Sequence, residues 1–180
     1  MAQQETQLFS NEANCYAYAV KCKQPINCAK GQARPGGAVP GADAGKFLEA
    51  LQAGVLADGG AKVAQLAEFS VNALTTTQIP APRAGWYLIA MLTNAVGFHF
   101  VRRQLKHLGG EPHWKWKQGN KGMVELNAYD HKAKDWVRVT NANFPSLVKG
   151  GMGTDGPGYA GWVTVTFFEV HKDGFTVTSS

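Results

Sequence analysis

The chain has 180 residues, of which 44% are hydrophobic, as expected for one globular domain that buries a full core. We expect a single domain over residues 1–180, with residues 1–9 as a loose N-terminal arm. The first twenty residues lack the basic start and apolar run of a signal peptide, and no apolar stretch approaches the roughly 20 residues that span a bilayer. These features predict synthesis in the cytoplasm and no membrane partner. An exported protein would have to be secreted, or delivered into a target cell, by a route that needs no cleavable signal.

The formal net charge of +5 is compatible with an anionic partner. The densest basic segment, HWKWKQGNK at 113–121, alternates lysine with tryptophan, as a strand with one solvent-facing side does. No recognised nucleic-acid-binding module accompanies the charge, so we expect no nucleic-acid partner.

Three cysteines, Cys15, Cys22 and Cys28, do not describe a disulfide scaffold, although Cys22 and Cys28 are close enough in sequence to pair. The chain has no Cys-x-x-Cys motif, and its five histidines lack ligand spacing. We therefore expect no metal site.

Helices are predicted in the first part of the chain. Asn14 or Ser10 can cap a first helix that runs to about Lys23. Residues 24–45 are rich in Gly and Pro and predict a long irregular loop of the kind that is usually functional or mobile. Apolar residues at helical spacing predict a second helix over 45–60, and 61–74 can form a shorter third one.

Strands are predicted from residue 85 onward, over 85–93, 97–104, 113–119 and 161–171, with a hairpin of 123–130 and 135–141 about the turn 131–134. Residues 174–180 can add one more strand. Helices followed by a run of neighbouring strands indicate an α+β fold, with N-terminal helices packed on a largely antiparallel sheet. The glycine-rich loop at 149–161 does not match a phosphate-binding pattern.

Cys15 and His99 are the candidate catalytic pair. A helix N-terminus favours the thiolate of a cysteine in its first turn, and a cysteine nucleophile needs a base within hydrogen-bond reach. His99 lies in the middle of a predicted strand between two phenylalanines. Each residue by itself is more typical of a protein core, but cysteine on an early helix and histidine on a later strand is the chain order of papain-like hydrolases. Cys22 and Cys28 are weaker candidates.

Four segments together resemble a family of bacterial and phage papain-like cysteine hydrolases. They are NCYAYAV with the Pro-Gly loop ARPGGAVPG, then FHFVRR, WKWKQG and YAGWVTVTFFEV, so that the likeness spans Asn14 to Val170. More distantly the chain is similar to cysteine/histidine-dependent amidohydrolases and to papain-like interbacterial toxins. The resemblance implies a papain-like domain with Cys15 as nucleophile, His99 as base and no cofactor.

One position departs from the family pattern. A histidine of the family's third strand falls at Trp116 here. Another residue would then have to orient His99, and Gln118 or Asn127 is expected to do so ahead of Asn120 or Asp130.

The remaining site residues follow from the same hypothesis. The backbone N–H of Cys15 and the side chain of Asn11 or Asn14 are candidate oxyanion donors, although Asn14 can equally be a helix cap. The loop at 31–45, including Gly36 and Gly37, is expected to border the substrate cleft, and Trp114 or Trp116 to form its wall.

These features predict a cysteine peptidase that hydrolyses an amide bond of a protein or peptide substrate through a thioester, acting as a toxin or effector. Such a toxin would normally have an immunity protein as its partner. A cell-wall amidase or endopeptidase is the first alternative, since positive charge favours an anionic wall. A catalytically inactive binding module on the same scaffold is the second.

Overall fold

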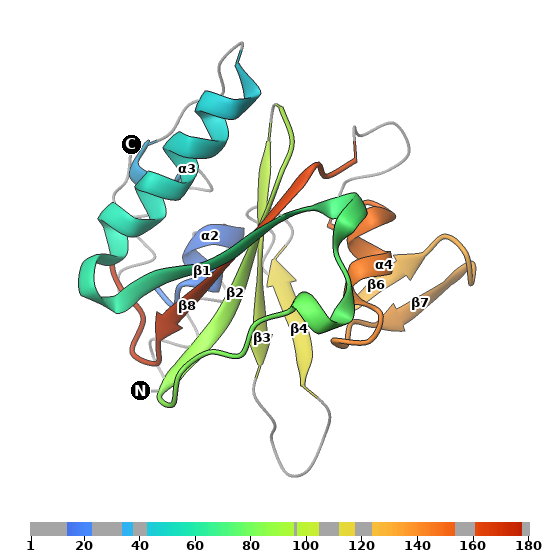
Figure 1. Cartoon of the computed structure of the whole chain (residues 1–180). Coiled ribbons are helices and arrows are strands. Elements are labelled where there is room, and N and C mark those ends of the chain that lie inside the picture. Colours follow the sequence, from blue (N-terminus) through green and yellow to red (C-terminus); the bar gives the residue numbers. More distant parts are fainter. Residues whose placement is uncertain are drawn as a thin grey trace.

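Six strands form one antiparallel sheet in the order β1-β8-β2-β3-β4-β5 in the computed structural model, which describes residues 14–22, 34–37, 43–95, 97–104, 112–117, 124–153 and 161–177 (Figure 1). A further hairpin of two strands forms a separate sheet. The strands of the large sheet are β1 (Val63–Ser70), β2 (Trp86–Thr93), β3 (Phe98–Gln104), β4 (His113–Lys117), β5 (Val124–Glu125) and β8 (Thr164–His171). The hairpin consists of β6 (Asn127–Asp130) and β7 (Asp135–Arg138). The expected α+β class with an antiparallel sheet is confirmed.

The α-helices of the described part of the chain are α2 (Cys15–Ala19), α3 (Ala44–Gly59) and α4 (Phe144–Lys149). Asn14 caps α2 by accepting a hydrogen bond from the backbone N–H of Ala17 at 3.0 Å. Asp43 caps α3 in the same way through the N–H groups of Gly45 and Lys46. The two predicted N-terminal helices are thus present, although the first is shorter than expected.

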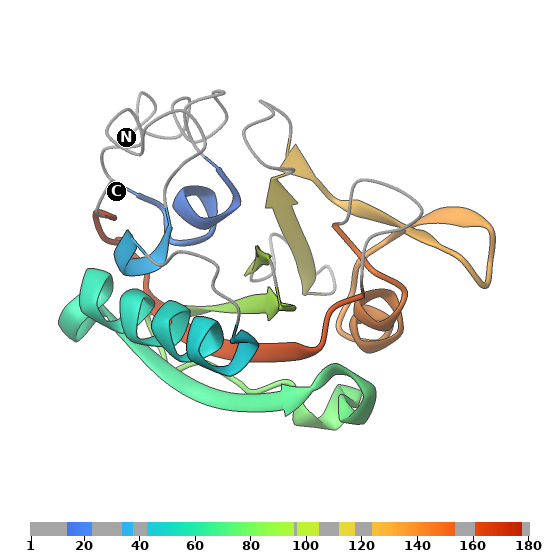
Figure 2. The ribbon, with the colours of Figure 1, turned by 90° about the horizontal axis from the view of Figure 1, so that it is seen from above.

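The sheet separates two hydrophobic cores. Helices α2 and α3 pack on one face, whereas α4 and the β6–β7 hairpin pack on the other, and Figure 2 shows these two groups on opposite sides of the view. Side chains of β8 alternate between the faces, with Phe168 and Val170 in the first core and Val165 and Phe167 in the second. We call the face that packs against α2 and α3 the α2 face.

The prediction of a helix over 61–74 is wrong, because residues 63–70 form strand β1, which pairs with β8 at the edge of the sheet. The spacing of apolar residues in this segment fits both the helical and the strand periodicity. Pairing with the apolar neighbouring strand β8 favours the strand. Helix α4, with Pro145 in its first turn, was not among the predicted elements.

The C-terminal segment differs from the expected strand in its described part. Residues 174–177 pair with no strand among the described residues, and Phe175 and Val177 instead pack into the core of the α2 face. Residues 178–180 lie outside the described residues.

Candidate functional site

Cys15 is the first residue of α2, and its side chain points at the sheet. It is only 6% exposed and belongs to the same core as Phe100 of β3. β3 and β4 pair with Val101 opposite Trp116, and the same register puts Lys117 of β4 beside Phe100. A thiol, a strand amide and a lysine therefore meet on the α2 face.

Burial controls the ionisation of this thiol. It raises the pKa of Cys15 from the ordinary 9.0 to about 11, while backbone hydrogen bonds from Phe100, Tyr16 and Cys15 and the positive charge of Lys117 lower it by less. Cys15 is thus a neutral thiol at neutral pH, surrounded by groups that favour its thiolate.

Lys117 is a functional candidate that the sequence pattern did not single out. Its side chain is fully buried, which is rare for lysine, and burial lowers its pKa while the neighbouring Cys15 acts in the opposite direction. A signal was present, because alternation in HWKWK places both lysines on one face and both tryptophans on the other.

The structure does not bring Cys15 and His99 together. His99 is buried on the face opposite α2, where its ring stacks on Trp162 with centroids 6.2 Å apart and lies directly against Gly153. The reason is strand geometry, since Phe100 faces α2 and its neighbour His99 must face away.

Trp114 and Trp116, the expected walls of the cleft, also lie on the face opposite α2. Trp114 is fully buried, stacks on Phe144 with centroids 4.2 Å apart and donates from Nε1 to Asn141 Oδ1 at 3.0 Å. Trp116 is buried in the same core. Both rings fill the interior behind the sheet and do not line an open cleft beside Cys15.

The other predicted site residues are dispersed. Asn14 acts as the cap of α2, so its Oδ1 is engaged with the backbone. Asn127, expected to orient His99, is exposed on β6 in the separate two-stranded sheet. Asn11, Gln118 and Asn120 lie outside the described residues. Cys28, the suggested disulfide partner of Cys22, also lies outside them.

Gly36 and Gly37 belong to a single turn, Pro35–Gly37, that packs on α3. Asp58 of α3 holds this turn to α2, because its Oδ2 accepts from the Gly36 N–H at 3.2 Å and from the Tyr16 hydroxyl at 2.8 Å. The predicted glycine loop is therefore linked to the residue that follows Cys15.

No protein-family model, curated protein or solved structure matches the chain. The described residues contain no cluster of three or more His, Cys, Asp or Glu that could hold a metal ion. Within the same part of the chain, no helix has the length and apolar character needed to cross a bilayer.

Proposed function

We propose that the chain is a cysteine-dependent amide hydrolase of papain-like architecture, with Cys15 as the nucleophile and Lys117 as its charged partner. The observation that carries this proposal is a fully buried lysine whose charge acts on a buried thiol at the first residue of a helix. The packing of that helix on an antiparallel sheet supports it further.

The proposed reaction is acyl transfer through a thioester. Burial lowers the pKa of Lys117, so at alkaline pH a fraction of this amine is neutral and can accept the thiol proton. The thiolate attacks the carbonyl carbon, and backbone N–H groups of Cys15 and Tyr16, which already face the sulfur, can donate to the oxyanion. Lys117 returns the proton to the leaving amine, and water then hydrolyses the thioester.

The rate of Cys15 alkylation by iodoacetamide, followed by peptide mapping from pH 6 to 11, tests this assignment. We expect the rate to rise up to about pH 11, because the pKa of Cys15 is about 11, whereas an ordinary thiol levels off above about pH 8.5. Lys117→Met should slow labelling several-fold in the lower part of this range, where Lys117 carries the positive charge that favours the thiolate.

His99→Ala is the decisive comparison. Labelling of Cys15 that is unchanged in His99→Ala and slowed in Lys117→Met supports the Cys15–Lys117 pair. The opposite result would reinstate His99 as the base and require a different arrangement of β3. Cys22, which is also buried, serves as the reference thiol within the same molecule.

We propose a protein or peptide as the substrate, with a toxin or effector role and an immunity protein as partner. Expression of wild type and Cys15→Ala in two bacterial compartments separates this function from cell-wall hydrolysis. A protein-cutting toxin should arrest growth from the cytoplasm, whereas a wall hydrolase should do so only from the periplasm. Equal harm by Cys15→Ala would rule out the nucleophile.

A binding module without catalysis is the second candidate. It is favoured by the neutral, buried state of Cys15 and by Trp116 at the position where the resembled family has a histidine. In that case Cys15→Ala would retain the full biological effect, and Cys15 would label no faster than Cys22 at any pH.

A further inference from the structure

A pair of like charges lies across two neighbouring strands on the α2 face. Arg102 of β3 is directly opposite Lys115 of β4, two residue pairs along from Phe100 and Lys117. Like charges at directly opposite positions repel and destabilise a sheet. Neither side chain forms an ion pair with a carboxylate of the described residues, so the positive charge of this pair is not neutralised there.

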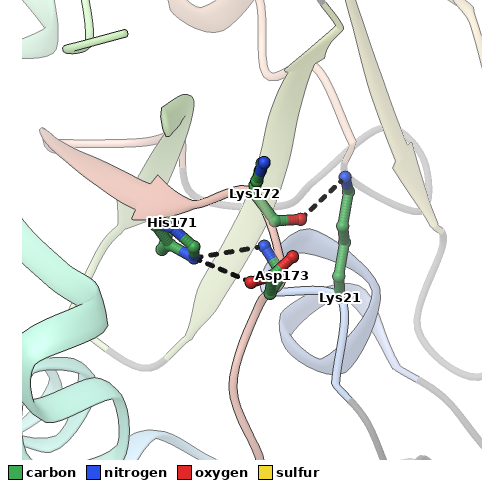
Figure 3. A network of polar contacts seen from close by, with 4 residues as sticks. All are labelled: Lys21, His171, Lys172 and Asp173. Atoms are coloured by element: carbon green, nitrogen blue, oxygen red, sulfur yellow. Dashed lines mark hydrogen bonds and ion pairs between the residues drawn. The ribbon is translucent and has the colours of Figure 1, made fainter. Parts of the chain in front are cut away.

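Two more cations are linked to this pair, Arg138 through its charge and Lys21 through the Tyr87 ring that Arg102 also approaches. Burial lowers the pKa of Lys115, and the positive charges of Arg102 and Arg138 lower it further. Lys21 follows α2, and its Nζ lies 4.9 Å from the centroid of the Tyr87 ring. A hydrogen bond of 3.3 Å to the Lys172 carbonyl holds Lys21 there (Figure 3).

The backbone of Lys21 has an unusual conformation. Its φ is +50°, in the left-handed region that favours glycine or asparagine at the end of a helix. A lysine at this position is conformationally unfavourable. The contacts of its ammonium group with the Lys172 carbonyl and the Tyr87 ring help to hold it in this conformation.

Tyr87 supplies a hydrogen-bond donor at the same place. The residue is only 6% exposed, and its hydroxyl has no hydrogen-bond partner among the described residues. The Arg102 guanidinium carbon lies 5.9 Å from the centroid of its ring. Burial raises the pKa of Tyr87, so the hydroxyl keeps the proton that it could donate. Buried polar groups normally have a partner, and an oxyanion among these cations would provide the acceptor.

We propose that Lys21, Tyr87, Arg102 and Lys115, which we call the Arg102 cluster, bind an oxyanion, and that this oxyanion is an acidic side chain of the substrate. The second part rests on the proposed function. Arg102 is two residues from Phe100 on β3, so the cluster begins roughly 7 Å along the strand from the thiol. The acidic residue would therefore lie next to, or close to, the bond that Cys15 attacks.

Inorganic phosphate at constant ionic strength tests the anion site by its effect on the thermal midpoint of unfolding. We expect phosphate to stabilise wild type and the control Lys132→Met equally, because Lys132 lies in the exposed turn of the β6–β7 hairpin. The apparent affinity should fall about tenfold in Lys115→Met and about fivefold in Tyr87→Phe. Equal stabilisation of all four proteins, or of none, would overturn the site.

The midpoints without phosphate separate anion binding from a structural role. Lys115→Met removes repulsion and Tyr87→Phe removes an unsatisfied hydroxyl, so both variants should be at least as stable as wild type. A cluster that only holds the fold together would show lower midpoints in both.

Charged and neutral alkylating reagents test whether the site lies beside the thiol. At Cys15, the ratio of the alkylation rate by iodoacetate to that by iodoacetamide should be higher than the same ratio for a free thiol. Both Lys115→Met and added phosphate should lower this ratio to the free-thiol value. Lys132→Met should leave it unchanged. Phosphate binding without this higher ratio would overturn the assignment of the anion to the substrate. Failure of the proposed function is distinguishable, because Cys15→Ala would then keep its biological effect while phosphate still binds.

Discussion

Cys15 makes the stability of the protein depend on alkaline pH. Folding favours the neutral thiol, whose pKa rises from 9.0 to about 11. The resulting stabilisation is complete below about pH 9 and is lost as the pH rises through 11, amounting to roughly 3 kcal/mol.

Urea unfolding of wild type and Cys15→Ala at several pH values measures this contribution. The difference between their free energies of unfolding should shrink by about 2 kcal/mol from pH 8 to pH 10.5. All other titrating groups are common to both proteins, so those that do not interact with Cys15, as Lys117 does, cancel in the comparison. A difference that stays constant with pH would show that the Cys15 thiol is not desolvated.

Gly153 limits the space around His99. A Cβ at this position would lie 2.6 Å from His99 Cδ2, and the φ of Gly153 is +80°. Gly85 is a matched control, because its φ is +79° but a Cβ there would meet no atom within 4 Å.

We expect Gly85→Ala to cost about 1 kcal/mol through backbone strain alone, and Gly153→Ala to cost about 1–3 kcal/mol more through displacement of the imidazole. Chemical denaturation of both variants measures the difference. Equal losses would mean that the imidazole can move aside freely.

Gly54 determines how closely the Pro35–Gly37 turn approaches α3. A Cβ on Gly54 would contact the Pro35 carbonyl and lie 2.7 Å from the Gly36 nitrogen. In most helices Gly→Ala stabilises by about 1 kcal/mol, but here we expect a loss of about 2–4 kcal/mol. Gly45→Ala in the first turn of the same helix, 3.3 Å from an Asp43 oxygen, should be close to neutral. Thermal unfolding of the two variants checks this contrast, and equal effects would contradict it.

Helices and strands with one clear hydrophobic periodicity could be predicted from the sequence. Elements that depend on contacts with residues distant in the sequence could not. The helix 45–60 and strands β2, β3, β4 and β8 have unambiguous patterns and capping or turn residues. Strand β1 and helix α4 depend on long-range pairing and packing that no local pattern contains.

The candidate site shows the same limit. The chain order of Cys15 and His99 suggested a catalytic pair. Whether His99 or its neighbour Phe100 faces α2 depends on the register of β3, since a shift of one residue would exchange the faces of these two side chains. Lys117 could be found only by combining its alternation with the pairing of β3 and β4.

At the scale of the whole molecule, the two sheets should differ in local stability. β8 lies between β1 and β2 and has buried residues on both faces, whereas the two-stranded β6–β7 hairpin exposes Trp136 to 63% and Tyr129 to 39%. An isolated hairpin is marginally stable, so its contact with the second core and the hydrogen bond from the Trp114 N–H to the Val139 carbonyl, next to β7, hold it.

Hydrogen–deuterium exchange with mass spectrometry should therefore show amides of 128–137 exchanging at least about 100-fold faster than those of 165–170. Peptides from the edge strand β1 serve as the reference between these extremes. Similar protection in the hairpin and in β8 would mean that both sheets unfold as one cooperative unit.

The alternation of β3 and β4 has a practical consequence for engineering. Residues 98, 100, 102, 115 and 117 face α2, whereas 99, 101, 103, 114 and 116 face α4 and the hairpin. Substitutions in the two sets share few neighbours, so their effects on unfolding should add nearly independently. Combinatorial libraries can thus vary the surroundings of the thiol through the first set and compensate lost stability through the second, without changing the backbone that both sets share.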